Sequence, residues 1–140
     1  MKTLQSDIVE VGFQLPELEL PPITRVQLVK YAGASGDFNP LHTVDEFAQK
    51  AGLDGVIAHG MLSMGFLGKY VRTLVKENAS IERLKVRFSH MAKPGDTLTC
   101  QGEVIKVEER GQHKSVQMEI RAVNQEGKTV TAGTSTVLFF

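Results

Sequence analysis

The pattern of apolar and polar residues changes its period near the middle of the chain. Between His59 and Asn78 the apolar residues recur every three or four positions, the spacing that places them on one face of a helix. From Leu84 onward they alternate with polar residues, which is typical of a strand with one buried side. The sequence therefore predicts one long helix followed by a strand-rich half. The residues on the apolar helix face are Met64, Leu67, Val71, Leu74 and Val75.

The strand-rich half divides into four predicted strands, separated by residues that favour turns. A Pro-Gly-Asp turn follows the first of them, and Gly127 marks a hairpin loop before the last. A further loop is expected at residues 108–112. The predicted strands span residues 84–88, 97–107, 116–122 and 129–139.

A short strand and a helix are predicted at the start of the chain. The strand, at residues 15–20, ends at two prolines, because proline cannot donate a hydrogen bond to a ladder. Thr24, with Gln27 three residues later, forms the capping-box pattern that begins a helix. We expect this helix to run to about Ala34.

A second, shorter helix is predicted between two loops. Thr43 and Glu46 repeat the capping-box spacing, and Gly52 is a natural C-terminal glycine for the helix that they begin. The flanking loops are expected at residues 33–41 and 53–58.

These elements predict an α+β fold. Antiparallel strands with one apolar face must cover that face, and the long helix is the obvious candidate. We therefore expect an antiparallel sheet wrapped around a long central helix. No repeat, low-complexity tract or flexible linker interrupts the chain, so residues 1–140 are interpreted as a single domain.

Composition and charge exclude several functions. The 16 basic and 16 acidic residues balance, which argues against a general nucleic-acid binder. The most apolar stretch, residues 56–75, contains His59, Lys69 and Arg72, so no membrane span is expected. The N-terminus does not resemble a signal peptide, and the single cysteine, Cys100, permits no intrachain disulfide. We expect a cytoplasmic protein.

The candidate chemistry lies in the loop Ser35–His42. Asp37 and His42 are five positions apart between glycine and proline residues, which can turn both side chains into one cleft. On spacing alone, the favoured interpretation of Asp37 is a turn carboxylate that bonds nearby amides, and that of His42 a surface or capping histidine.

Hydration of an enoyl thioester needs a base, an acid and a donor for the oxyanion. Asp37 and His42 could provide the first two. Gly60 stands at the predicted start of the long helix, where a backbone N–H has no partner within the helix and the dipole favours negative charge. Its lack of a side chain would let a thioester oxygen approach closely.

Two segments resemble a known family when they are taken together. The run Gly36–His42, with the sequence GDFNPLH, is followed by Ala58–Met61, with the sequence AHGM. In this order and at this spacing they resemble the MaoC-like dehydratases. That family includes R-specific enoyl-CoA hydratases (the hydratase 2 type) and the 3-hydroxyacyl-ACP dehydratase subunits of mycobacterial type. The resemblance extends to the strand and turn between Arg87 and Asp96.

The resemblance implies a hot-dog fold, a homodimer or a heterodimer with a related subunit, and no metal or other cofactor. It implies that Asp37 and His42 are the catalytic pair and that the Gly60 N–H stabilises the oxyanion. Asn39 would position the loop, and His59 would orient the segment before the long helix. The substrate would be an enoyl group on coenzyme A or acyl carrier protein, and the product an R-3-hydroxyacyl thioester.

Two other functions remain open at this point. Hot-dog folds also host acyl-CoA thioesterases, although these place their acid differently from the Asp-x-Asn-Pro-x-His loop. The chain could also be an acyl-binding subunit of a heteromeric dehydratase. A metal site built from Asp37, His42 and His59 is conceivable by residue type, but these residues lack a regular ligand spacing.

The first turns of the long helix carry small residues. Ser63 is expected to bond a backbone carbonyl of the preceding turn, with the active-site loop as the alternative partner. Close packing against the sheet is the favoured reason for Gly60, Gly65 and Gly68, and room for a ligand is the alternative.

Overall fold

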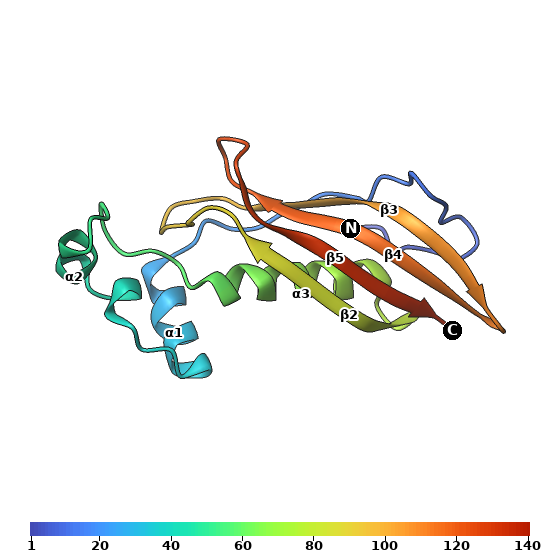
Figure 1. The fold of residues 1–140 in the computed structure, drawn as a ribbon, viewed down its shortest axis with the longest axis horizontal. Coiled ribbons are helices and arrows are strands. Elements are labelled where there is room, and N and C mark those ends of the chain that lie inside the picture. The colour runs from blue at the N-terminus through green and yellow to red at the C-terminus, as the bar shows by residue number, and fades with distance from the viewer.

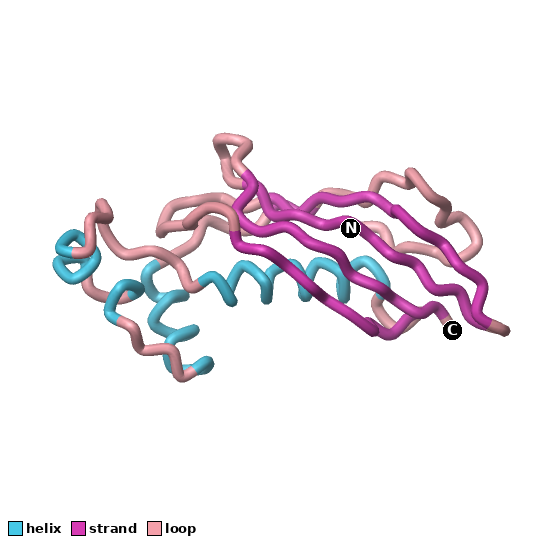
Figure 2. Tube along the Cα trace, viewed as in Figure 1, coloured by secondary structure: helices cyan, strands magenta, loops and turns pink.

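The computed structural model describes residues 1–140 as an antiparallel sheet with one long helix along its face (Figure 1). The other helices gather beyond one end of the sheet (Figure 2). The predicted α+β class, with a sheet around a central helix, is confirmed. The elements are β1 (Leu18–Glu19), α1 (Arg25–Ser35), the 3-10 turn η1 (Pro40–His42), α2 (Asp45–Lys50), α3 (Gly60–Val75), β2 (Ala79–Phe88), β3 (Thr99–Arg110), β4 (His113–Val123) and β5 (Thr129–Phe139).

The sheet has the strand order β1-β3-β4-β5-β2, and every pairing is antiparallel. Two hairpins join β3, β4 and β5, whereas β2 crosses over to pair with β5 at the edge of the sheet. The crossover brings the end of β2 beside the start of β5, with Phe88 opposite Thr131. This corner of the sheet lies near the first turn of α3, since residues of all three elements line one pocket.

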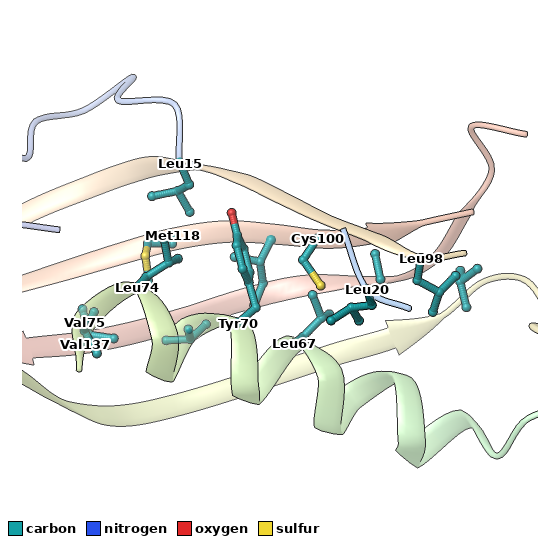
Figure 3. Close-up of a cluster of buried hydrophobic side chains, with 14 of the residues drawn as sticks. Leu15, Leu20, Leu67, Tyr70, Leu74, Val75, Leu98, Cys100, Met118 and Val137 are labelled. Atoms are coloured by element: carbon teal, nitrogen blue, oxygen red, sulfur yellow. The ribbon is translucent and has the colours of Figure 1, made fainter. Parts of the chain in front are cut away.

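The core lies between α3 and the sheet (Figure 3). Four residues of the predicted apolar face of α3 are buried there, namely Leu67, Val71, Leu74 and Val75, whereas Met64 is only partly buried. Cys100 is fully buried in this cluster, and burial raises the pKa of its thiol to about 12. Tyr70 is also fully buried, and its hydroxyl donates to the carbonyl of Pro16 at 2.6 Å. No helix is both long and apolar enough to cross a bilayer.

The two predicted capping boxes have different outcomes. Thr24 caps α1, since its hydroxyl accepts a hydrogen bond from the Gln27 N–H at 3.0 Å. Thr43 does not cap α2, so that prediction is wrong. Its N–H donates to the Pro40 carbonyl and closes the 3-10 turn η1, and α2 begins after Val44, which makes no side-chain cap bond.

The helix and strand ends also differ in places from the prediction. The long helix ends at Val75 rather than near Asn78, because Lys76 adopts a left-handed φ of 47° while its N–H still donates to Arg72. The strand β2 begins at Ala79, earlier than the predicted Leu84. A bulge near Ile81 interrupts the alternation of apolar and polar residues in the first part of this strand. The predicted loop at residues 108–112 is mostly strand, since β3 and β4 are separated only by residues 111–112.

Candidate active site

The segment that carries Asp37 is shaped by hydrogen bonds between neighbouring residues. Helix α1 ends at Ser35 and is capped by Gly36, whose φ of 76° favours glycine. The Asp37 N–H donates to Ser35 Oγ at 3.1 Å, and the Asn39 N–H donates to Asp37 Oδ1 at 3.2 Å. The side-chain oxygen of Asn39 accepts from the Leu41 N–H at 3.0 Å and so caps η1. Asn39 thus shapes the loop between Asp37 and His42.

Asp37 and His42 face each other with a gap between them. Asp37 Oδ2 and His42 Nε2 are 3.8 Å apart, too far for a direct hydrogen bond. The Asp37 side chain is 52% exposed, whereas that of His42 is 11% exposed. His42 Nδ1 lies 2.8 Å from the Ile57 carbonyl oxygen. Because a carbonyl only accepts, this bond places the proton of a neutral His42 on Nδ1 and leaves Nε2 free towards Asp37.

His59 lies next to this pair and is buried, with 2% of its surface exposed. Its ring stacks on that of His42, with centroids 3.8 Å apart, and meets the edge of Tyr31 at 4.7 Å. Its Nε2 donates to the Asp37 carbonyl at 3.2 Å, and its Nδ1 has no partner. Desolvation, assisted by the nearby His42, lowers the pKa of His59, although the Asp37 carbonyl bond opposes this.

Gly60 is the first residue of α3, directly after His59. Its N–H therefore belongs to the helix-terminal donors that have no partner within the helix. A Cβ at Gly60 would touch the Phe88 ring at 3.4 Å, one at Gly68 would touch Leu84 at 3.5 Å, and one at Gly65 would meet nothing within 4 Å. Packing against the sheet thus requires glycine at none of the three positions, contrary to the favoured explanation.

A pocket of about 330 Å³ opens between the first turn of α3 and the corner formed by β2 and β5. It brings together His42, His59 and Gly60, with Asp37 beyond His42. The pocket wall contains both apolar side chains and hydroxyl groups. The remaining lining residues are Ile57, Ala58, Ser63, Phe88, Ser89, His90, Met91, Ala92, Val130 and Thr131.

Ser63 makes the expected bond to the preceding turn, since its hydroxyl donates to the Gly60 carbonyl at 2.7 Å. It also lies 2.6 Å from the Thr131 hydroxyl. Thr131 was not expected at the site, because an alternating strand pattern does not show which element a buried threonine faces. The same strand carries a second buried hydroxyl residue, Ser135, so the sequence has no signal that singles out Thr131.

Asp37, His42 and His59 also form a group whose donor atoms lie within 4.8 Å of one another. However, His59 Nε2 and His42 Nδ1 already donate to backbone carbonyls. A metal ion could reach His59 Nε2 only by displacing its proton and breaking its bond to Asp37. The expectation that this site works without a metal stays a prediction.

Comparison with known proteins finds a matching family model and relatives named as hydratases. A family model described as the MaoC like domain matches residues 14–126. The peroxisomal enoyl-CoA hydratase 2 of Arabidopsis thaliana is 38% identical over 66 residues, which cover 46% of this chain and 21% of the plant enzyme. The chain spans less than a third of the length of the curated relatives that it matches, for example 12% and 7% of the first two.

Solved structures share the fold over nearly the whole chain. The R-hydratase PhaJ1 from Pseudomonas aeruginosa superimposes with a TM-score of 0.83 at 30% identity, over 94% of this chain and 82% of its own. The ChsH1-ChsH2 complex from Mycobacterium tuberculosis gives 0.81 at 23% identity, over 95% and 99%. These neighbours confirm the predicted hot-dog fold. Because the family model matches most of the length of this chain, the chain belongs to the MaoC-like dehydratase domain family.

Proposed function

We propose that this chain hydrates trans-2-enoyl thioesters to R-3-hydroxyacyl thioesters, and catalyses the reverse dehydration. It is then a lyase that acts on an acyl group carried by coenzyme A or acyl carrier protein. The observation that carries the proposal is the 3.8 Å gap between Asp37 Oδ2 and His42 Nε2 beside the pocket that contains Gly60. The R-hydratase name of the solved relative supports the same reaction and the same product configuration.

The gap between Asp37 and His42 suits a shared water molecule. A water there can donate to the Asp37 carboxylate and to the unprotonated Nε2 of His42, because both groups accept. As the water oxygen bonds to the β-carbon, one of its protons passes to this pair. The pair returns a proton to the α-carbon, so the site regains its starting state.

Negative charge accumulates on the thioester oxygen between these two steps. The Gly60 N–H, at the start of α3, is the proposed donor for that oxygen, and the helix dipole adds favourable potential. Gly60 is exposed and lines the pocket. Because it has no side chain, the thioester oxygen has room to approach the first turn of α3. Asn39 and His59 take positioning roles in this proposal through their bonds to the loop.

We also propose that the chain works as a dimer. The ChsH1-ChsH2 relative is a complex of two different chains, so the partner here would be a second copy or a related subunit. Strand β2 pairs with β5 on one side only, which leaves a sheet edge available in the isolated chain.

Purified protein mixed with crotonyl-CoA tests the reaction directly. We expect the absorbance of the conjugated enoyl thioester to disappear and chiral analysis to identify the R-3-hydroxy product. A free-thiol assay run in parallel separates the alternatives. Release of coenzyme A without hydration would contradict the proposal in favour of a thioesterase, and binding of the enoyl thioester without turnover would favour an acyl-binding subunit.

A further inference from the structure

The first turn of α3 carries the proposed oxyanion donor, yet little within the turn fixes its orientation. His59, at the cap position, makes no side-chain bond to the turn. Gly60 has no Cβ, so its backbone torsions are less restricted than those of any other residue. The Leu62 N–H donates to the His59 carbonyl at 3.1 Å, which is the tight bond of a helix end. The direction of the Gly60 N–H therefore depends on contacts from outside the helix.

Two buried hydroxyls supply such a contact. Ser63 is 3% exposed and Thr131 is fully buried, and their oxygens are 2.6 Å apart. A serine hydroxyl has one proton, and Ser63 directs it to the Gly60 carbonyl at 2.7 Å. Thr131 must then donate to Ser63. The order of donation runs from Thr131 through Ser63 to Gly60, and we call this set the hydroxyl chain.

The sheet end of the hydroxyl chain is firmly held. Thr131 lies in β5, opposite Ala122 of β4 on one side and Phe88 of β2 on the other. Its backbone position is therefore fixed by pairing on both sides. The chain links this rigid strand to the turn of α3 that contains Gly60, while Ser63, Gly60 and Thr131 all line the same pocket.

We propose that Ser63 and Thr131 are positioning residues that aim the Gly60 N–H at the thioester oxygen. This inference rests on the proposed function, because it needs Gly60 as the oxyanion donor. Such a donor is effective only when it is held within a few tenths of an ångström of its working position. The hydroxyl chain holds the Gly60 carbonyl against β5, which fixes the peptide plane after Gly60 and restrains the Cα to which the N–H is attached.

Steady-state kinetics with crotonyl-CoA tests the effect on turnover. We expect Ser63→Ala and Thr131→Val each to lower kcat about 10-fold with little change in KM, since a misaimed donor keeps part of its effect. Thr131→Ser keeps the hydroxyl and should restore kcat. The double variant should lose no more than either single variant, because the two residues act as one unit.

Ser135 offers a matched control. It is also buried in β5, and its hydroxyl also donates to a backbone carbonyl, that of Arg83 at 2.8 Å, but it does not line the pocket. Ser135→Ala should leave kcat unchanged. An equal loss in Ser135→Ala, or wild-type kcat in Ser63→Ala, would overturn the proposal.

A second measurement is independent of the reaction. The amide signal of Gly60 in an NMR spectrum reports the orientation and mobility of its N–H directly. We expect this signal to shift and broaden in Ser63→Ala and Thr131→Val, but to stay in place in Ser135→Ala and Thr131→Ser. An unchanged Gly60 signal in Ser63→Ala would overturn the hydroxyl chain as a positioning device even in an active enzyme. An inactive wild-type protein with the expected NMR changes would contradict the hydration proposal alone.

Discussion

The two stacked histidines of the site are held in different ways. His42 keeps Nε2 free towards Asp37, whereas His59 uses Nε2 to hold the Asp37 backbone and is shielded from solvent. Because desolvation disfavours its charged form, the pKa of His59 is lowered and the ring adds no positive charge beside His42 near neutral pH. His59 therefore has the environment of a structural residue, although a histidine in a pocket can also act in catalysis.

The lowered pKa of His59 predicts a pH dependence of stability. The unfolded chain binds a proton at His59 more readily than the folded protein, so stability is fully present above the ordinary histidine pKa and falls as pH decreases below it. Denaturant unfolding between about pH 7.5 and about pH 5.5 should show this loss, and His59→Phe should reduce the slope. An equal slope in the wild type and the variant would contradict this assignment.

The sequence could predict which motif residues gather but not the whole pocket. His42, His59 and Gly60 of the two motifs line one pocket, and Asp37 Oδ2 lies 3.8 Å from His42 Nε2, while their catalytic roles stay a prediction. Each of these residues lies within two positions of a glycine, a proline or a helix start, and such positions leave a local signal. Thr131 contacts a residue 68 positions earlier, and no local pattern encodes that contact.

At the scale of the elements, α3 and β5 fix the site and were predicted with nearly their observed bounds. The helical periodicity of α3 made this possible, and the hairpin loop at Gly127 marked the start of β5. The errors lie where a local bond or irregularity shifts the end of an element, as at Thr43, whose N–H closes the 3-10 turn so that α2 begins later, after Val44. The bulge near Ile81 similarly hides the first half of β2.

Two glycines in these elements should respond oppositely to substitution by alanine. A Cβ at Gly65 in α3 would meet nothing within 4 Å, so Gly65→Ala should raise the free energy of unfolding by about 1 kcal/mol. A Cβ at Gly133 in β5 would overlap the Lys85 carbonyl and lie 2.7 Å from Val86 Cα, both backbone atoms of β2. Gly133→Ala should therefore cost at least about 3 kcal/mol. Denaturant unfolding of both variants checks this pair, and a stable Gly133→Ala would contradict the observed strand packing.

Gly60→Ala separates stability from activity in the first turn of α3. The three atoms nearest to the added Cβ would all belong to the ring of Phe88, which is 48% exposed and can move aside. We expect the free energy of unfolding to change by less than about 1 kcal/mol. Hydration of crotonyl-CoA should fall at least about 10-fold, since the methyl group occupies the approach to the N–H. Full activity in a folded Gly60→Ala would exclude close approach of the thioester oxygen.

At the scale of the whole molecule, the pocket lies at the corner where α3, β2 and β5 meet, close to the exposed side chains of Phe88 and Met91. A second subunit bound near this corner would shield these side chains and the sheet edge at β2. Light scattering after size exclusion should give about twice the 15.4 kDa mass of one chain. A monomer that hydrates crotonyl-CoA at the same rate at every protein concentration would contradict the proposed dimer.

The central claim is that Asp37 activates the attacking water. The most direct test compares crotonyl-CoA hydration by the wild type, Asp37→Asn and the control Asp7→Asn, which changes an exposed aspartate outside the pocket. We predict that Asp37→Asn loses at least about 100-fold in kcat while its melting temperature stays near that of the wild type, because the side chain is half exposed. Asp7→Asn should keep full activity. Wild-type turnover in a folded Asp37→Asn would contradict the account.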